Sequence, residues 1–263
     1  RNLLEELDSP GEWFHDKAAS ALFFWPPEPL TEGSVRVPVT ENLIRIEAKA
    51  AWITVRGFTL EGCSGAAVFV AGADDCLIAG NTLRNVASRF DPAAIEIGGG
   101  HRCGAVGNDI SDAENGGIRI GGGDLKTLEP GGNYADNNYV HHIGIENGHS
   151  CGIWLSGVGQ RVSHNLIHDI TRCGVFGGGP DCIIEYNRIR HVNLMTEDTG
   201  GRYGGGMWHI RGEIIRYNFV TDTLGFGRSG DRWTSPYYSW GIYLDSCQSY
   251  TRVYGNIVAR TTV

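Results

Sequence analysis

The feature that most constrains the fold is an internal repeat built around asparagine. Each copy has an apolar residue three positions before the Asn and another two positions after it. The copies are spaced 22 to 38 residues apart, and periods of this length with one small unit per copy are typical of solenoids. The seven repeat asparagines are Asn81, Asn108, Asn138, Asn165, Asn187, Asn218 and Asn256.

The repeat unit predicts an all-β chain. Its segments are short, alternating and rich in β-branched residues, as strands are. Three such strands and three turns fit the shortest spacing of 22 residues, so we expect a right-handed parallel β-helix, a single-stranded solenoid. Stacked strands lie ~4.8 Å apart, so each repeat Asn should bond backbone groups of its own and the adjacent coil. Asn also tolerates the left-handed conformation of a turn.

Two segments before the repeat, "GEWFHD" (11–16) and "ALFFWPPE" (21–28), predict short strands. We therefore divide the chain into residues 1–41, strands that lead into the solenoid, and residues 42–263, a parallel β-helix of about eight coils whose last coil is incomplete. An open solenoid end offers unpaired strand edges, so we expect further coils or domains in a longer parent chain.

The composition limits the partners. The net charge is −8, and its overall field disfavours polyanions such as nucleic acid or acidic glycans. No run approaches the ~18 apolar residues of a membrane span. The seven cysteines form no CxxC motif and no Cys/His cluster at zinc spacing. We therefore expect buried free thiols, with disulfides or metal binding as the alternative, and we predict no metal site and no cofactor.

A second series of segments predicts strands with one face in solvent. It includes "GIRIGGG" (117–123), "GIWLSG" (152–157) and "GIYLDSC" (241–247). Side chains alternate along a strand, so the apolar second and fourth positions should point inward and the third and fifth outward. The third position reads Phe69, Glu96, Arg119, Trp154, Phe176, Tyr203 and Tyr243. The fifth position reads Ala71, Gly98, Gly121, Ser156, Gly178, Gly205 and Asp245.

This outward face is a candidate glycan groove. Small residues at the fifth position leave room, and the rings offer faces to the C–H side of a sugar; the alternative is a plain solvated sheet face. Two long connections, 121–133 and 225–240, could wall a cleft over Tyr203 to Asp245, because solenoid insertions usually lie on the binding face. The candidate substrate-binding residues are Glu96, Arg119, His149, Trp154, Arg202, Tyr203, Trp233 and Tyr243.

Arg202 breaks the inward pattern. It stands where neighbouring copies have Ile or Val, and a buried unpaired guanidinium is very costly. Either the register slips in the Gly-rich segment 200–206, or Arg202 turns outward into the site. Turn or interstrand hydrogen bonds are expected for the histidines that follow the repeat asparagines, which are His141, His142, His168 and His191.

Several segments together carry a family resemblance. They are "NLLEELDSPGEWFHD", "GGGDLKTLEPGGNYADNNYVHHIG", "LSGVGQRVSHNLIHDI", "IIEYNRIRHV", "EDTGG" and "GIYLDSCQSYTRVYGNIV". Over nearly the whole chain, the sequence resembles the right-handed β-helix glycoside hydrolases of the fucosidase/xylanase type. It departs from that pattern at Arg202, Gly206 and Met207, where Ile, Arg and Asp are expected.

The resemblance implies two catalytic carboxylates, one in an Asp-x-Gly segment and one in a Tyr-Leu-Asp segment. In this chain they are Asp198 and Asp245. The implied activity is hydrolysis of glycosidic bonds in a plant or algal polysaccharide or oligosaccharide by a secreted or periplasmic enzyme. On a straight strand the pair would lie roughly 23 Å apart, so the chain must bend sharply between Asp198 and Gly201. Otherwise Glu96 or Asp231 is the better partner for Asp245.

Two other functions remain open from the sequence. A polysaccharide lyase or epimerase acting on uronic acids would use a cation to neutralise the sugar carboxylate, and Arg119, Arg202 or a bound Ca²⁺ could serve. A non-catalytic glycan-binding β-helix module would use the same groove without chemistry. Asp198 itself could be an ordinary turn residue that caps backbone amides.

Overall fold

The computed structural model describes residues 3–31, 35–89, 92–145 and 147–262, and the chain falls into two compact units, residues 1–37 and 38–263. The first unit contains the 3₁₀ helix η1 (Leu4–Glu6) and an antiparallel hairpin of β1 (Trp13–Asp16) and β2 (Ala21–Phe24). The two short strands expected before the repeat are therefore confirmed.

The second unit contains three parallel sheets, each with eight strands among the described residues. Sheet 1 consists of β3 (Ile44–Ile46), β6 (Val68–Ala71), β9 (Ala93–Gly98), β12 (Gly116–Ile120), β15 (Ile153–Leu155), β18 (Val175–Gly177), β21 (Thr199–Gly204) and β26 (Ser239–Leu244). Sheet 2 consists of β4 (Thr54–Arg56), β7 (Leu77–Ala79), β10 (Gly104–Val106), β13 (Tyr134–Asp136), β16 (Arg161–Ser163), β19 (Ile183–Glu185), β22 (Ile214–Arg216) and β27 (Arg252–Tyr254). Sheet 3 consists of β5 (Thr59–Glu61), β8 (Thr82–Arg84), β11 (Asp109–Ala113), β14 (Tyr139–Ile143), β17 (Leu166–Ile170), β20 (Arg188–Val192), β23 (Phe219–Thr223) and β28 (Ile257–Thr261).

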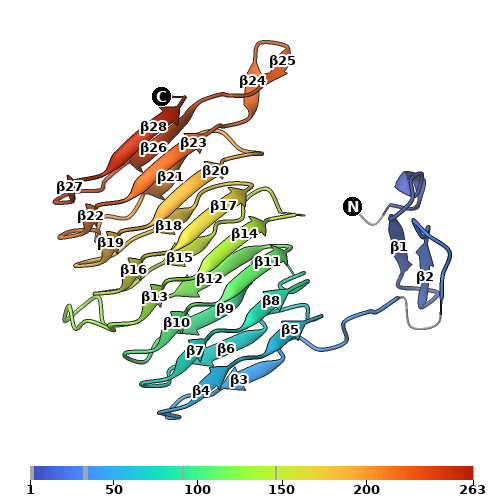
Figure 1. Ribbon diagram of the computed structural model, residues 1–263, viewed down its shortest axis with the longest axis horizontal. Helices are drawn as coiled ribbons and strands as arrows, with labels where there is room; N and C mark the ends of the chain where they lie inside the picture. The colour runs from blue at the N-terminus through green and yellow to red at the C-terminus, as the bar shows by residue number, and fades with distance from the viewer. Residues whose placement is uncertain (1–2, 32–34, 90–91, 146, 263) are drawn as a thin grey trace. The chain divides into compact units, whose positions relative to one another are not determined.

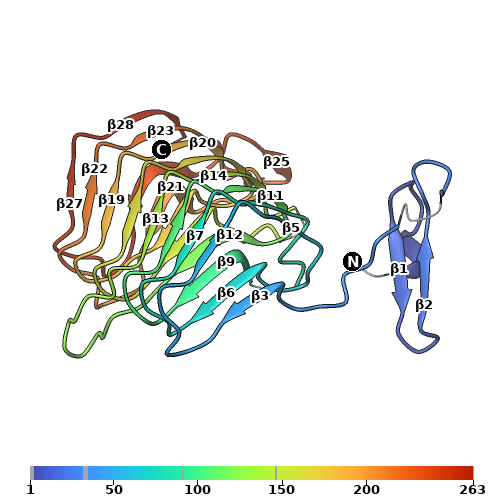
Figure 2. The same cartoon turned by 60° about the horizontal axis from the view of Figure 1, so that its bottom comes forward.

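Successive strands belong to sheets 1, 2 and 3 in turn, so the chain passes through all three sheets once per coil (Figures 1 and 2). We number the coils 1 to 8, from β3–β4–β5 to β26–β27–β28. The last coil was expected to be incomplete, yet it has one strand in each sheet. An additional hairpin, β24 (Gly227–Ser229) with β25 (Arg232–Thr234), lies between β23 and β26. The predicted all-β class and parallel strands are confirmed.

Stacked aliphatic residues hold the three sheets together. In sheet 1, Ile95 pairs with Ile118, and Ile118 pairs with Ile153 in the next coil. All three are at most 1% exposed, which confirms that the second and fourth positions of the repeat point inward. Leu244, in the last coil, is 38% exposed because no described coil packs on its far side.

The repeat asparagines form a continuous ladder at the corner between sheets 2 and 3. The side-chain oxygen of Asn138 accepts hydrogen bonds from the backbone N–H and the side-chain amide of Asn108, at 3.0 and 2.9 Å. Its own amide donates to the carbonyl of Ala105 in the preceding coil at 2.9 Å. The structural role is therefore confirmed, with one correction. The left-handed residue is the one before the Asn, such as His164 at φ 56°, and not the Asn itself.

In coils 4 to 8, a glycine at the start of the sheet 1 segment packs closely against sheet 3, whereas coils 2 and 3 have Ala67 and Ala94 at this position. A Cβ on Gly174 would lie 2.5 Å from a methyl carbon of Ile189, and one on Gly201 would lie 2.5 Å from Val220. Both partners belong to sheet 3, so the glycine column is where sheet 1 meets the methyl groups of sheet 3. In coils 4 to 8 a Cβ at this position would clash with a methyl group of sheet 3, so glycine is required there.

Seven free cysteines are present in the described residues, six buried and one, Cys247, exposed. This outcome confirms the expected buried thiols and leaves Cys247 as the exception. Cys151 and Cys173 lie in adjacent coils with their sulfur atoms 2.9 Å apart.

Candidate active site

An aromatic ladder runs along the outer face of sheet 1. Ring centroids are 4.5 Å apart between Trp154 and Phe176, 5.4 Å between Phe176 and Tyr203, and 5.1 Å between Tyr203 and Tyr243. Trp240 stacks on Tyr243 at 4.1 Å and extends the ladder. Each ring is partly exposed, so the predicted outward orientation of the third position is confirmed.

Asp245 lies at the carboxyl end of β26, beside the last ring of the ladder. One carboxylate oxygen accepts the backbone N–H of Ser246 at 2.6 Å, and the other accepts the hydroxyl of Tyr203 at 3.0 Å. The Ser246 N–H and then the hydroxyl donors lower the pKa of Asp245 despite some desolvation. Asp245 is therefore ionised at neutral pH. A Cβ on Gly205, in the preceding coil, would lie 2.5 Å from the Asp245 Cβ, so the small residue there makes room for the carboxylate.

Asp198 lies at the start of β21 and folds back over the same face. Its backbone is left-handed, with φ 50°, and its N–H donates to the carbonyl of Tyr238 at 2.9 Å. A Cβ on Gly200 would come within 3.1 Å of the Arg202 carbonyl oxygen, which a straight strand does not allow. The sharp bend that the candidate pair requires is present.

The two carboxylates meet at Tyr243. The Tyr243 hydroxyl donates to Asp198 at 3.3 Å and also interacts with Asp245. Burial, followed by the charges of Asp198 and Asp245, raises the pKa of Tyr243. Burial and Asp245 raise the pKa of Tyr203 to about 12. Both phenols therefore stay protonated at neutral pH and act as hydrogen-bond donors to the pair.

The alternative partners for Asp245 lie elsewhere. Asp231 is on the β24–β25 hairpin, with a fully exposed side chain that pairs with Arg228 at 3.3 Å. Glu96 is in coil 3, five coils from Asp245, and accepts the backbone N–H of Ala93. Glu197, next to Asp198, points toward the base of the hairpin, where its carboxylate adjoins Gly227. Among the described carboxylates, Asp198 is the one that the bend brings to the Asp245 end of the ladder.

The prediction for Arg202 was wrong in both of its forms. Arg202 pairs with Val175 and Ile242 in the regular register, and it is 1% exposed, so the register does not slip and the side chain does not enter the site. Its guanidinium donates to both oxygens of the buried Glu213, at 2.9 and 2.8 Å. This partner offsets part of the cost of burying the cation, while Nε and Nη1 of Arg202 have no hydrogen-bond partner among the described residues. Arg202 is therefore a core residue and not a substrate-binding residue.

Two glycines beneath Tyr203 leave the space that this buried ion pair occupies. A Cβ on Gly204 would lie 2.6 Å from the Arg202 guanidinium, and one on Gly178 would lie 2.8 Å from the Glu213 carboxylate. Gly178 was expected to be part of an outward-facing floor, and that expectation was wrong at this position. The missing side chain leaves space inside the coil for two charged groups, while Gly205 leaves space outside for Asp245.

The two long connections do not share a cleft. The hairpin connection adjoins Asp198, because Phe226 N–H donates to the carbonyl of Thr196 at 3.0 Å. Trp233 is 67% exposed on this hairpin and stacks on Phe226 at 5.2 Å. Loop 121–133 packs on coil 5, where Gly131 N–H donates to the carbonyl of Val158 at 2.9 Å. It therefore does not flank the floor from Tyr203 to Asp245, contrary to expectation.

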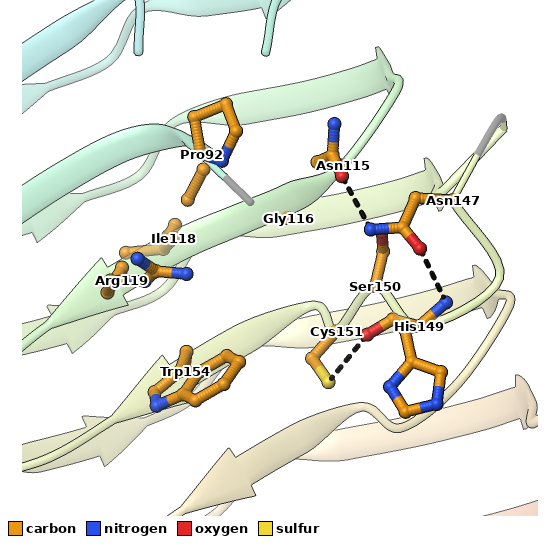
Figure 3. A pocket seen from close by; sticks show the side chains of 11 residues that line it. Pro92, Asn115, Gly116, Ile118, Arg119, Asn147, His149, Ser150, Cys151 and Trp154 are labelled. Atoms are coloured by element: carbon orange, nitrogen blue, oxygen red, sulfur yellow. Dashed lines mark hydrogen bonds between the residues drawn. The ribbon is translucent and has the colours of Figure 1, made fainter. Parts of the chain in front are cut away.

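The other predicted binding residues line a small hollow between β12 and β15 (Figure 3). Arg119 and Trp154 lie at one end, with the guanidinium 4.9 Å from the ring centroid, and Asn147 and His149 lie at the other. The hollow has a volume of about 20 Å³, room for about one water molecule. It lies three to four coils, roughly 15–20 Å, from Asp245. We place the candidate active site at the carboxylates, because a pair of carboxylates can supply both the acid and the nucleophile or base for bond cleavage, and regard the hollow as the far end of the same ladder.

Two residues near the ladder were not among the sequence candidates. Arg172 contacts both ring nitrogens of His149, at 2.8 and 3.2 Å, and its guanidinium lies 5.6 Å from the Tyr203 ring centroid. Glu213 is the buried partner of Arg202. Glu213 lies five residues before a repeat Asn, and the equivalent residue of the preceding coil is the buried Cys182. This spacing predicts that Glu213 points inward, so it could have identified Glu213 as the partner of Arg202.

The histidines that follow the asparagines lie on sheet 3 and make the expected interstrand contacts. His141 contacts the Asp109 carboxylate at 3.1 Å, and Asp169 accepts hydrogen bonds from His168 and His191. Within the described ranges, no three His, Cys, Asp or Glu side chains form a group that could hold a metal ion. A helix long and apolar enough to cross a membrane is absent from the described part of the chain.

Comparison of the chain with protein-family models, with curated proteins and with solved structures finds no match. The resemblance to β-helix glycoside hydrolases stays a prediction from the sequence motifs.

Proposed function

We propose that residues 38–263 form a right-handed parallel β-helix that hydrolyses glycosidic bonds of a plant or algal polysaccharide or oligosaccharide. The observation that carries the proposal is the convergence of Asp198 and Asp245 on the hydroxyl of Tyr243, at one end of an exposed aromatic ladder. Paired carboxylates beside a binding surface are what glycoside hydrolysis requires. A secreted or periplasmic location follows from a substrate of this kind.

The hydrogen bonds favour different roles for the two carboxylates. Asp245 accepts a backbone N–H and the Tyr203 hydroxyl, and these donors stabilise the ionised form. It is suited to attack the anomeric carbon or to activate water. Asp198 then acts as the acid that protonates the leaving oxygen, from the bent segment at the start of β21. Tyr243 positions the pair by donating its hydroxyl to it.

The aromatic ladder supplies the binding surface. Its rings face solvent at one-coil spacing, so a glycan can lie along the solenoid axis with successive sugars over successive rings. The Trp154 end lies about three coils, roughly 15 Å, from Tyr243. This length suits an oligosaccharide or a polymer better than a single sugar.

A uronate lyase or epimerase is the second candidate. It is favoured by one observation, the guanidinium of Arg172 beside Tyr203, because such an enzyme needs a cation to neutralise the carboxylate of the sugar. The mechanism differs in product, since a lyase leaves an unsaturated sugar and a hydrolase leaves a saturated one.

The test is turnover on a panel of neutral and uronic-acid glycans, with reducing ends and the ultraviolet absorbance of unsaturated sugars followed in the same samples. New reducing ends without absorbance, lost in Asp198→Asn and Asp245→Asn, support hydrolysis. Absorbance supports the lyase. A folded protein that binds glycans and forms neither product contradicts the hydrolase and the lyase. If the uronic acids of the recovered glycan also keep their configuration, the epimerase is contradicted and a binding module is supported. The anomer first released then distinguishes retention from inversion.

A further inference from the structure

Arg172 is a half-buried cation on the ladder side of coil 6. Its guanidinium lies 5.6 Å from the Tyr203 ring centroid and contacts the ring of His149. Within the described residues, no carboxylate lies within ion-pair distance of Arg172. By contrast, Arg161, Arg216 and Arg260 elsewhere on the solenoid each pair with an acid.

The imidazole beside Arg172 does not balance its charge. Burial, and then the positive charge of Arg172, lower the pKa of His149. His149 is therefore neutral at neutral pH, and it can donate or accept one further hydrogen bond. The arginine keeps its full positive charge at a place where ring faces are open to a ligand.

A second observation points to a ligand in the adjacent hollow, which shares His149 with the Arg172 contact. Ser150 follows His149 and lines the hollow of Figure 3. It is 4% exposed, and its hydroxyl has no hydrogen-bond partner among the described residues. Buried hydroxyl groups are normally paired, and an unpaired one is costly. A polar group that enters the hollow from the ladder would satisfy it.

We propose that Arg172, with His149 and Ser150, forms a subsite for the carboxylate of an acidic sugar in the same glycan that the Asp198–Asp245 pair cleaves. The inference rests on the proposed function, because it names the substrate class of that site. A planar carboxylate fits the fork of a guanidinium better than a sugar hydroxyl does. Arg172 lies in coil 6 and Asp245 in coil 8, with the Tyr203 ring between them, so the acidic sugar occupies the ladder at least two coils, roughly 10 Å, from Asp245.

The charges around the pair determine where the acidic unit binds. Two carboxylates converge at Tyr243, so an acidic sugar at the cleaved position would be repelled. The Arg172 subsite removes that conflict by moving the acidic unit along the ladder. The substrate class is therefore a mixed glycan in which a uronic acid adjoins a neutral sugar. The net charge of −8 disfavours a uniformly acidic polymer but not one local contact, since screening limits long-range repulsion to about 8–10 Å.

Binding separates this subsite from catalysis. Calorimetric titration would use the Asp245→Asn protein, so that probes are not consumed. The probes are tetrasaccharides in which a uronic acid adjoins neutral hexoses, each compared with its methyl ester, which removes the charge and leaves the backbone. The acid should bind about 10- to 100-fold more tightly than the ester, and added salt should reduce the difference.

The matched variants test the residue. Arg172→Gln should lower the affinity for the acid to the affinity for the ester, and Arg172→Lys should recover part of the preference for the acid. Arg190→Gln, a substitution in the same coil on sheet 3, should change neither affinity. Equal binding of acid and ester, a preference that survives Arg172→Gln, or no binding of any acidic probe would overturn the subsite. Hydrolysis of neutral glycans by the wild-type protein, abolished by Asp245→Asn, would still support the proposed function in each of those cases.

Discussion

The asparagine ladder and the aromatic ladder both repeat once per coil through the same three parallel sheets, yet they differ in which residue types each position accepts. At the corner between sheets 2 and 3, each buried Asn donates a side-chain hydrogen bond to the Asn of the next coil. On the outer face of sheet 1, a ring, an arginine or a glutamate can occupy the equivalent site. The difference shows that burial, and not the repeat itself, determines which residue type a position requires.

The physical reason is hydrogen-bond satisfaction. The amide of Asn165 donates to the Ala135 carbonyl and to Asn187, while its oxygen accepts two hydrogen bonds from Asn138. A different side chain would leave several buried groups unpaired. An outward side chain has water as a hydrogen-bond partner, so residues as different as Trp154 and Arg119 can occupy the same position in adjacent coils. Functional residues can therefore replace one another at these positions without destabilising the fold.

Arg202 is an exception to this contrast between buried and exposed positions. It is an inward position filled by a charge, and the structure accepts it because Glu213 and the small residues at 178 and 204 surround it. The buried pair lies beneath Tyr203, one strand position from the ladder. The interior beneath the candidate site therefore contains a buried ion pair, whereas sheet 1 elsewhere is packed by aliphatic residues.

The largest effect is expected from a substitution on the aromatic face. Asp245→Asn should lower turnover by about 10³-fold or more, because a carboxamide cannot attack the anomeric carbon or act as a base. The melting temperature should change little, since Asp245 is partly exposed. Asp231→Asn, on the exposed hairpin, is the matched control and should retain activity. Comparable loss in both variants would contradict the assignment.

The second effect tests the buried pair. Glu213→Ala leaves the Arg202 guanidinium charged and unpaired in the interior, so it should lower the free energy of unfolding by about 3–5 kcal/mol. Chemical denaturation measures it. The double variant Arg202→Met, Glu213→Leu should recover most of the loss, because it removes both charges. A double variant as unstable as the single one would show that the packing, and not the charge, was decisive.

The third effect tests the asparagine ladder. Asn165→Ala should cost about 3 kcal/mol, because the N–H and side-chain amide of Asn138 lose their acceptor and the Ala135 carbonyl loses its donor. Asn256→Ala, in the last coil, should cost less, since Asn256 is partly exposed. Denaturation midpoints of the two variants give the comparison. Equal losses would mean that burial does not set the requirement.

The smallest effect is a pH dependence on sheet 3. Burial lowers the pKa of His168 despite its hydrogen bond to Asp169, so the folded state resists a proton that the unfolded chain accepts near pH 6.5. This contribution is present above about pH 6.5 and is lost as the pH falls toward the lowered value. Melting temperatures at pH 7.5 and 5.5 should show a decrease that His168→Gln reduces. If the melting temperatures at pH 7.5 and 5.5 differ by the same amount in the His168→Gln variant as in the wild-type protein, the role of His168 is contradicted.

Part of the site could be predicted from residue spacing alone. Asp245 was placed correctly on the outer face because a strand alternates, and Tyr203 and Tyr243 followed from the same rule. Asp198 required a bend that the sequence allowed through Gly200 and Gly201 but could not prove. Arg172 was missed because it stands in a turn, where spacing predicts no direction for a side chain.

The sequence by itself determined the repeat, the inward and outward positions of each strand and the asparagine ladder, because these depend on local periodicity and on copies stacking on one another. Only the tertiary structure decided that Asp198 reaches Tyr243, that Arg202 is buried against Glu213 and that loop 121–133 lies away from the pair. Those outcomes depend on contacts between residues from different coils or beyond a sharp turn. Their geometry follows from packing in three dimensions, and no period along the chain encodes it.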